Sequence, residues 1–333
     1  MAARRVTARD VARHAGVSQS TVSYVLNDAP NQTFPETTRA KVRQAAKELG
    51  YTPSAAARAL RRGTSESVLV VLPDAPIGEN LARAIETITE IVEPHGYTVV
   101  YRRQQDARSL SSLWHELMPA AIANLAAFPV EERERIEQAG IPVVASGLDF
   151  GDSQVLGMPQ SVVGRLHVQH LVDRGHRRIA FAASTDPKVG EFLTRRLEGV
   201  RSECAERGLP APVVVAVPLD EDAAARAVAE LLAGPEPVTA VSAYNDEIAF
   251  AVLAGMRRHG LTAPDDLAVI GVDNIPLAQF AVPPLTTVDI HPDVIGRRMG
   301  RLLLERLKPE LVLPAAASEA SAMAAELVLR RST

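Results

Sequence analysis

The chain has 333 residues, of which 47% are hydrophobic, and this is typical of a globular protein of two or three domains with buried cores. The only cysteine, Cys204, excludes an intrachain disulfide and a multi-cysteine metal site and is consistent with a reducing compartment. The N-terminus lacks the apolar run of a signal peptide, and no apolar stretch is long enough to span a membrane. We therefore expect a cytoplasmic protein with no membrane partner.

The formal net charge of −4 is distributed unevenly along the chain. Residues 1–63 contain eleven Lys and Arg residues against four Asp and Glu residues, so this segment carries +7 and the remainder carries −11. A basic N-terminal segment on an acidic body predicts a polyanionic partner, such as nucleic acid, for that segment only.

The stretch from Thr7 to Asn27 has the pattern of two short helices around a tight turn. Thr7 and Asp10 have the spacing of a capping box, Gly16 supplies the positive φ that the turn needs, and Ser18 caps the second helix. The two apolar faces consist of Val11, Ala12, Ala15, Val22, Val25 and Leu26. This agreement favours a DNA-binding helix-turn-helix over the alternative, an ordinary helical hairpin with a polar face.

A third helix follows a short loop. Thr33 and Glu36 have the spacing of a second capping box with Pro35 in the first turn, and Gly50 ends the helix. Residues 54–63 predict a short alanine-rich helix that is hardly stable alone. It is either a plain linker or a hinge that folds only on DNA, and the periodicity does not decide between the two.

From Ser67 onward, apolar strands alternate with helices. The expected strands cover residues 68–72, 98–101, 121–127, 142–145, 178–182, 213–217, 240–243 and 267–271. The expected helices cover residues 80–92, 109–117, 131–139, 162–174, 192–207, 222–232, 247–259 and 294–307. Because near-continuous apolar strands between helices indicate parallel sheets covered on both faces, and eight such units exceed one comfortable sheet, we expect two α/β subdomains.

These patterns resemble the lactose-repressor (LacI/GalR) family over essentially the whole chain. The matching headpiece motifs are VTARDVARHAGVSQSTVSYVLN, ETTRAKVRQAAKELGYTP and AARAL. The matching core motifs are GIPVVASG, HLVDRGHRRIAF, RRLEGVR, AYNDEIAFAVLAGMRRHGL, LAVIGVDN, PPLTTV and AELVLRRST. The resemblance implies an all-α helix-turn-helix headpiece followed by an α/β core of two parallel-sheet subdomains, similar to periplasmic binding proteins of type I.

The resemblance also implies domain limits. The headpiece takes residues 1–52, the hinge helix and linker take residues 53–66, and the effector-binding and dimerisation core takes residues 67–333. Within the core, we expect one subdomain to comprise about 67–159 and 292–318, and the other to comprise about 160–291 and 319–333.

Several site residues follow from the resemblance position by position. Gln19, Ser20 and Tyr24 match positions that read bases, and Ser18, Thr21 and Ser23 match phosphate contacts. Leu60 matches the hinge leucine that enters the minor groove. The full set of expected DNA contacts is Thr7, Ser18, Gln19, Ser20, Thr21, Ser23, Tyr24, Asn27, Tyr51, Ala57 and Leu60. The expected effector contacts are Asp149, Arg196, Asn245 and Asp273.

The core residues also make chemical sense without the resemblance. Asp273 and Asn245 each follow an expected strand, at the edge where open α/β sheets bind ligands. Together with Arg196 they offer the donors and acceptors that suit a polyhydroxylated ligand. The plainer alternatives are a helix cap at Asn245 and a solvated helix face at Arg196.

Several departures of the chain from the family pattern matter for function. Tyr24 stands where the family usually has an arginine, so bidentate guanine reading is lost there. The common Asn-Pro-Phe-Phe after the first core strand is replaced by DAPIGEN, which removes a stacking aromatic, and the identity of the effector stays open.

We therefore expect a ligand-responsive transcription regulator, a repressor that binds a palindromic DNA operator as a homodimer and takes a small, polar, sugar-like effector. The alternatives are a solute-binding module of a transport system and a DNA-binding regulator with no physiological ligand. No motif of an enzyme, a cofactor site or a metal site stands out, so we expect neither catalysis nor a cofactor.

Overall fold

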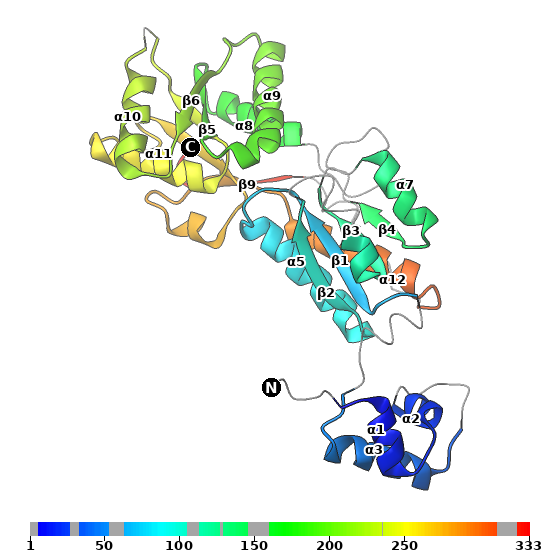
Figure 1. Ribbon diagram of the computed structural model, residues 1–333. Helices are drawn as coiled ribbons and strands as arrows, with labels where there is room; N and C mark the ends of the chain where they lie inside the picture. Colours follow the sequence, from blue (N-terminus) through cyan, green and yellow to red (C-terminus); the bar gives the residue numbers. More distant parts are fainter. Residues whose placement is uncertain are drawn as a thin grey trace. The chain divides into compact units, whose positions relative to one another are not determined.

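A computed structural model describes residues 6–26, 33–52, 63–104, 113–126, 129–145, 160–234, 236–311 and 325–333 (Figure 1). Internal contacts divide the chain into an N-terminal unit, residues 1–66, and a second unit, residues 67–333. Four of the expected site residues, Asn27, Ala57, Leu60 and Asp149, lie outside the described residues, as does the expected hinge helix. No helix within the described ranges is both long and apolar enough to cross a membrane.

The N-terminal unit contains three helices, α1 (Ala8–Ala15), α2 (Gln19–Leu26) and α3 (Glu36–Glu48). They close on a small core in which Val11, Val22, Val25 and Val42 are at most 2% exposed. The turn between α1 and α2 places Gly16 at φ 67°, in the left-handed region that the sequence predicts. The helix-turn-helix prediction is confirmed.

Two of the three expected helix caps form. The backbone N–H and the hydroxyl of Thr7 both donate to Asp10 Oδ2, over 3.0 and 2.7 Å. Ser18 Oγ accepts from the backbone N–H of Thr21 over 3.0 Å. The expected cap at Thr33 is wrong, because Pro35 has a non-helical ψ of 142° and α3 begins only at Glu36. Glu36 is then the first helical residue rather than the third, so it is not in the capping-box position.

The second unit contains two sheets, as the sequence predicts. The first has the order β2-β1-β3-β4 and is entirely parallel. Its strands are β1 (Ser67–Leu72), β2 (Thr98–Arg103), β3 (Ala121–Asn124) and β4 (Val143–Ala145). Helices α5 (Glu79–Val92), α7 (Val130–Gln138) and α12 (Pro292–Leu307), and the short η1 (Glu93–His95), belong with these strands to what we call the first lobe.

The second sheet has the order β10-β9-β8-β7-β5-β6 and is parallel except for β10, which runs antiparallel to β9. Its strands are β5 (Ile179–Ser184), β6 (Val213–Val217), β7 (Ala240–Ala243), β8 (Ala268–Val272), β9 (Thr286–Asp289) and β10 (Glu326–Val328). Helices α8 (Gln160–Asp173), α9 (Gly190–Glu206), α10 (Glu221–Leu232) and α11 (Asp246–Arg258), with η2 (Pro187–Val189) and η3 (Pro276–Phe280), complete the second lobe.

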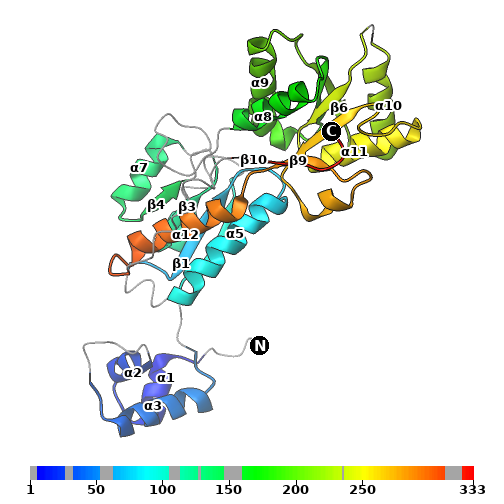
Figure 2. The same cartoon turned by 180° about the vertical axis from the view of Figure 1, so that it is seen from behind.

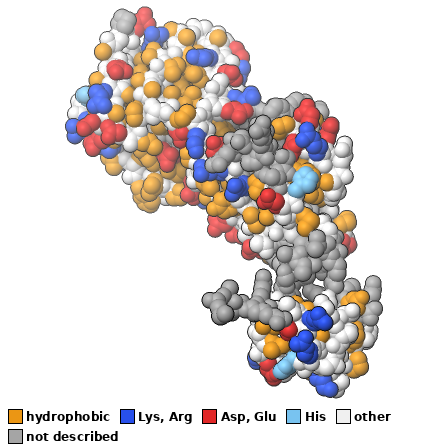
Figure 3. Space-filling view, viewed as in Figure 1, with side chains coloured by type: hydrophobic (Ala, Val, Ile, Leu, Met, Phe, Trp, Pro, Cys, Tyr) orange, Lys and Arg blue, Asp and Glu red, His pale blue; other side chains and the backbone are white. Residues whose placement is uncertain are grey.

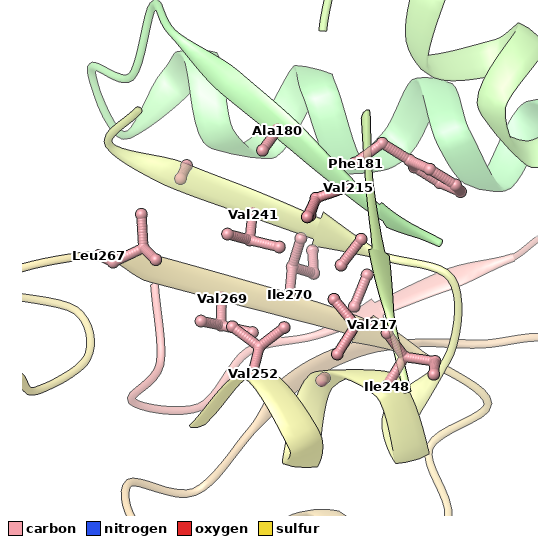
Figure 4. Close-up of a cluster of buried hydrophobic side chains, with 14 of the residues drawn as sticks. Ala180, Phe181, Val215, Val217, Val241, Ile248, Val252, Leu267, Val269 and Ile270 are labelled. Atoms are coloured by element: carbon pink, nitrogen blue, oxygen red, sulfur yellow. The ribbon is translucent and has the colours of Figure 1, made fainter. Parts of the chain in front are cut away.

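The core of the second lobe explains why the sequences of most of its strands are continuous apolar runs. Phe181, Val241 and Ile270 are at most 1% exposed and belong to the same cluster of buried side chains as Ile248 and Val252 of α11 (Figure 4). Both faces of this sheet are covered, so nearly every strand position is apolar.

The chain passes between the lobes more than once. After β9 it returns to the first lobe as α12, which lies beside α5 (Figure 2). The two helices approach closely at Gly296, where an added Cβ would lie 2.7 Å from the carbonyl oxygen of Ala84. Only glycine permits that approach without a backbone shift. The chain then re-enters the second sheet as β10.

Candidate functional site

The outward face of α2 consists of polar and aromatic side chains. Val22 and Val25 point into the small core, which leaves Gln19, Ser20 and Tyr24 exposed on the opposite side. Tyr24 is 37% exposed, and its ring stacks near that of Phe34, with the centroids 6.3 Å apart. Lys and Arg side chains lie on the face of this unit that is visible in Figure 3.

The start of α2 presents hydroxyl groups next to the backbone N–H groups of the first helical turn. Ser18 Oγ and Thr21 Oγ1 share a hydrogen bond of 2.8 Å, and Ser23 follows as a half-buried residue. A helix N-terminus with hydroxyl donors favours phosphate, because the backbone N–H groups and the helix dipole both attract an anion. Thr7 is exposed at the start of α1, and Tyr51 packs against the small core.

A cavity of about 440 Å³ lies in the second unit, where the loops after the strands of both sheets meet. Asn80 and Leu125 reach it from the first lobe, and Arg196, Asn245 and Asp273 reach it from the second. The lining loops follow β1, β3, β5, β6, β7, β8 and β9, all at the carboxyl ends of their strands. This is the edge at which open α/β sheets bind ligands.

Arg196 is only 6% exposed and is held by three neighbours. Its Nε donates to Gln160 Oε1 over 2.9 Å, its Nη1 donates to the Tyr244 carbonyl over 2.6 Å, and its Nη2 lies 3.5 Å from Asp273 Oδ1. The guanidinium also lies over the Tyr244 ring, 4.9 Å from the centroid. The solvated-face alternative for Arg196 is therefore wrong.

Asn245 has a structural role in addition to lining the cavity. It is the N-cap of α11, and its Oδ1 accepts from the backbone N–H of Ile248 over 3.0 Å. Its Nδ2 lies 3.4 Å from Glu247 Oε2. The helix-cap alternative is thus correct, and it is compatible with a side chain that faces the cavity.

Asp273 lies where the two lobes meet. Its Oδ1 accepts from Asn80 Nδ2 of the first lobe over 2.9 Å. Its backbone has φ 109°, a strained value for a residue with a side chain. Burial raises the pKa of this carboxyl group to about 6 against the opposing effect of Arg196, and the nearby Glu247 raises it further.

Asp246 holds the loop that carries Asp273. It is fully buried, and its Oδ1 and Oδ2 accept from the Thr287 hydroxyl over 2.6 Å and from the Ile275 N–H over 2.9 Å. Burial raises the pKa of Asp246 to about 7, although the Thr287 hydrogen bond lowers it.

Sequence reasoning did not find Asn80, Gln160 or Tyr244 as cavity residues. The only signal at Asn80 is its place in the first turn of the helix after the first core strand. Its partner, Asp273, is 193 residues away in the chain.

Comparison with known proteins follows the same division of the chain. Residues 7–54 match the model of bacterial regulatory proteins of the lacI family, and residues 168–333 match a periplasmic binding protein-like domain. The HTH-type transcriptional repressor CytR of Escherichia coli K12 is 31% identical over 341 residues, which cover 98% of this chain and 96% of CytR. This chain belongs to the LacI family.

Two further LacI-family proteins agree with this assignment. The ribose operon repressor of Escherichia coli K12 is 33% identical over 313 residues, which cover 90% of this chain and 93% of that repressor. The crystal structure of the lac repressor dimer bound to operator has a TM-score of 0.76 at 24% identity and covers 99% of both chains, which shows a shared fold. The chain is a DNA-binding transcription regulator whose relatives are repressors rather than enzymes.

Proposed function

We propose that this LacI-family regulator represses transcription as a homodimer on a palindromic operator and responds to a small polar effector in the cavity. The observation that carries the effector proposal is the convergence of Arg196, Asn245 and Asp273 with Asn80 at the carboxyl ends of two sheets. A ligand that replaces the Asn80–Asp273 hydrogen bond would favour one arrangement of the lobes over another, and a ligand changes DNA affinity only through such a preference.

The DNA contacts are proposed on the exposed face of α2. Gln19, Ser20 and Tyr24 are exposed, and the hydroxyls at the helix start suit phosphate. The exposed Thr7, the half-buried Ser23 and Tyr51, which packs against the small core, are proposed as additional contacts. Asn27, Ala57 and Leu60 are proposed from the family resemblance alone.

The homodimer proposal is supported by an apolar surface on the second lobe. Leu277, Phe280 and Val282, which lie within six residues of chain, are 62%, 71% and 73% exposed. Large apolar side chains gathered on a surface are typical of interfaces between subunits. A second copy of this chain is the occupant that a two-fold operator requires.

The effector is proposed to be sugar-like, because the ribose operon repressor is a relative and because the cavity offers carboxylate and amide groups to hydroxyls. The experiment compares operator affinity with and without a ligand from a melting screen of sugars, for the parent and for Asp273→Ala. We expect the mutant to keep operator binding and to lose the ligand response, since each charge-assisted hydrogen bond contributes roughly 1.5–3 kcal/mol. A mutant that keeps the full response would show that the effector binds elsewhere.

A further inference from the structure

The cavity of the second unit is strongly acidic. Glu79, Asp186, Glu247 and Asp273 line it, whereas Arg196 is the only Lys or Arg among its described lining residues. At the rim, Lys188 Nζ lies 3.6 Å from Asp74 Oδ1, so this lysine is already paired with another acid.

Ion pairs with Lys and Arg neutralise only some of the carboxylates in and beside the cavity. Arg196 offsets Asp273, and Lys188 offsets Asp74. Within the described part of the chain, no Lys or Arg side chain forms an ion pair with Glu79, Asp186 or Glu247. Among the described residues, these three carboxyl groups therefore line the cavity without a Lys or Arg side chain to balance their charge.

Arg196 is poorly placed to attract an anionic ligand. Its Nε and Nη1 already donate to Gln160 and to the Tyr244 carbonyl, and its Nη2 faces Asp273. A phosphate or carboxylate in the cavity would have to take these donors from their protein partners while facing the three unpaired acids. An anionic ligand would be repelled by these acids, although water screens the repulsion at the exposed Glu79 and Glu247 more than at the half-buried Asp186.

The acids lie close enough together to act on the same groups. The Glu247 charge contributes to the raised pKa of Asp273. Burial raises the pKa of Tyr244 to about 12, and Asp273, Asp186 and Glu247 all act in the same direction. A cation bound among these groups would relieve their mutual repulsion.

The rest of the cavity wall is largely apolar and includes an aromatic ring besides that of Tyr244, which lies against Arg196. Leu81, Ile248, Ile290 and Ile295 line it, and the half-buried Phe192 offers the ring. An apolar wall suits the C–H face of a sugar ring, and an aromatic face also attracts an ammonium group.

We propose that the effector is an amine-bearing, hydroxylated molecule of monosaccharide size, such as an aminosugar, whose ammonium group binds among Glu79, Asp186 and Glu247. This rests on the proposed function, since it names the ligand class of the same cavity. Hydroxyls of the ligand bond to Asp273 and Asn245, and the ammonium group supplies the positive charge that the cavity lacks.

Calorimetry on the full-length protein tests the proposal with charge-matched probes. D-glucosamine and D-galactosamine carry the ammonium group, D-glucose and D-galactose lack it, N-acetyl-D-glucosamine keeps the nitrogen without the charge, and D-glucose 6-phosphate adds negative charge. We expect at least one aminosugar to bind about tenfold or more tightly than its neutral counterparts, the scale of one charge-assisted hydrogen bond. Equal or tighter binding of a neutral or phosphorylated probe, or no binding of either aminosugar, would overturn the proposal.

A variant links the preference to a named carboxylate. Glu247→Gln keeps an acceptor for Asn245 but removes the charge, so it should reduce the aminosugar preference severalfold and leave binding of neutral sugars nearly unchanged. Glu198→Gln, on the exposed side of α9 and outside the cavity, is the matched control and should keep the full preference. An unchanged preference in Glu247→Gln would contradict the assignment.

Operator binding by the same preparations separates the two proposals. A protein that binds its operator and no aminosugar would overturn the ligand class alone. A protein that fails to bind DNA upstream of its own coding region more tightly than random DNA would overturn the proposed function itself.

Discussion

Asp246 has no contact with solvent, yet both of its carboxylate oxygens accept hydrogen bonds. The Thr287 hydroxyl bonds to Oδ1, and the Ile275 N–H bonds to Oδ2, which holds the loop from Asp273 to Ile275 against α11. Gly271 leaves the space for this carboxylate, since an added Cβ there would collide with Asp246 Oδ1. The residue therefore positions Asp273, although it does not line the cavity itself.

The raised pKa of Asp246 predicts a pH-dependent stability. Its carboxyl group holds a proton up to about pH 7 in the folded protein but loses it near 3.8 in the unfolded chain. The folded state then binds more protons between these values, so this contribution to stability is greatest below pH 3.8 and is lost as the pH rises to 7. As the pH rises through this window, the free energy of unfolding of the parent should fall by up to about 1.4 kcal/mol per pH unit relative to that of Asp246→Asn.

Urea unfolding at pH 5, 6, 7 and 8 measures this difference. Asp265→Asn, at an exposed position, is the control and should run parallel to the parent at every pH. If the free energy of unfolding of Asp246→Asn also changes with pH in the same way as that of the parent, the Asp246 carboxylate is not a source of the pH-dependent stability.

Residues that follow a strand could be assigned to the cavity from sequence, whereas their partners could not. Asp273 and Asn245 are placed by the rule that parallel strands end at one edge of the sheet. Asn80 and Gln160 reach Asp273 and Arg196 only through contacts that span 193 and 36 residues of chain. Local patterns carry no information on such pairs, and the strained backbone at Asp273 has no local signal either.

At the scale of elements, the contact between α5 and α12 depends on a missing side chain. A Cβ at Gly296 would lie 2.7 Å from the Ala84 carbonyl oxygen and 2.8 Å from Thr87 Cβ. Gly296→Ala should therefore destabilise the protein by roughly 1–3 kcal/mol, the usual cost of overpacking, although alanine is the better helix former.

Gly190→Ala is the matched control for this prediction. Gly190 begins α9 with φ −54°, and an added Cβ there would meet no atom within 4 Å. Thermal unfolding should show a lower melting temperature for Gly296→Ala and an unchanged or slightly higher one for Gly190→Ala. Equal melting temperatures for the two variants would show that α5 and α12 can move apart with little loss of stability.

The expected strands have continuous apolar runs, whereas β9 (Thr286–Asp289) lacks one and the three-residue β10 is too short to stand out. β9 contains Thr286 and Thr287, which are both fully buried but polar. Their burial becomes possible only through partners elsewhere, such as Asp246, which accepts from the Thr287 hydroxyl, and Ser332, whose Oγ accepts from the Thr286 N–H over 2.8 Å. Sequence patterns alone therefore predict a loop at a short polar strand, because the hydrogen-bond partners that permit its burial are distant in the chain.

At the scale of the whole molecule, the basic segment predicts how salt and sequence act on operator binding. Each phosphate contact should contribute about −0.9 to the log–log slope of affinity against salt. Gln19→Ala should leave this slope unchanged but reduce the preference for operator over random DNA by roughly 1–3 kcal/mol, because base contacts specify and phosphate contacts position.

Gel-shift titrations at several salt concentrations measure both quantities. Gln44→Ala, an exposed glutamine on α3, is the control and should keep slope and preference. A changed slope with an unchanged preference in Gln19→Ala would place this side chain on the phosphate backbone instead of the bases.

The exposed apolar side chains of η3 predict how the subunits associate. A charge at Phe280, which is 71% exposed, should weaken the dimer without unfolding the lobe, because the side chain has few internal contacts. Phe280→Asp should therefore sediment as a monomer at concentrations where the parent sediments as a dimer, and its operator affinity should fall. Leu329→Asp, a change at a comparably exposed leucine (61%) outside that surface, is the control. A parent that sediments as a monomer would contradict the proposed assembly.

The return of the chain between lobes has a consequence for the order in which a newly made polypeptide can fold. Residues 6–52 form their core from contiguous segments, so they can fold as soon as they leave the ribosome. The first lobe must wait for α12, which is made after β1 to β9, and the second sheet must wait for β10. Neither lobe can therefore be completed before most of the other exists, and the usual domain-by-domain maturation during translation does not apply to this pair.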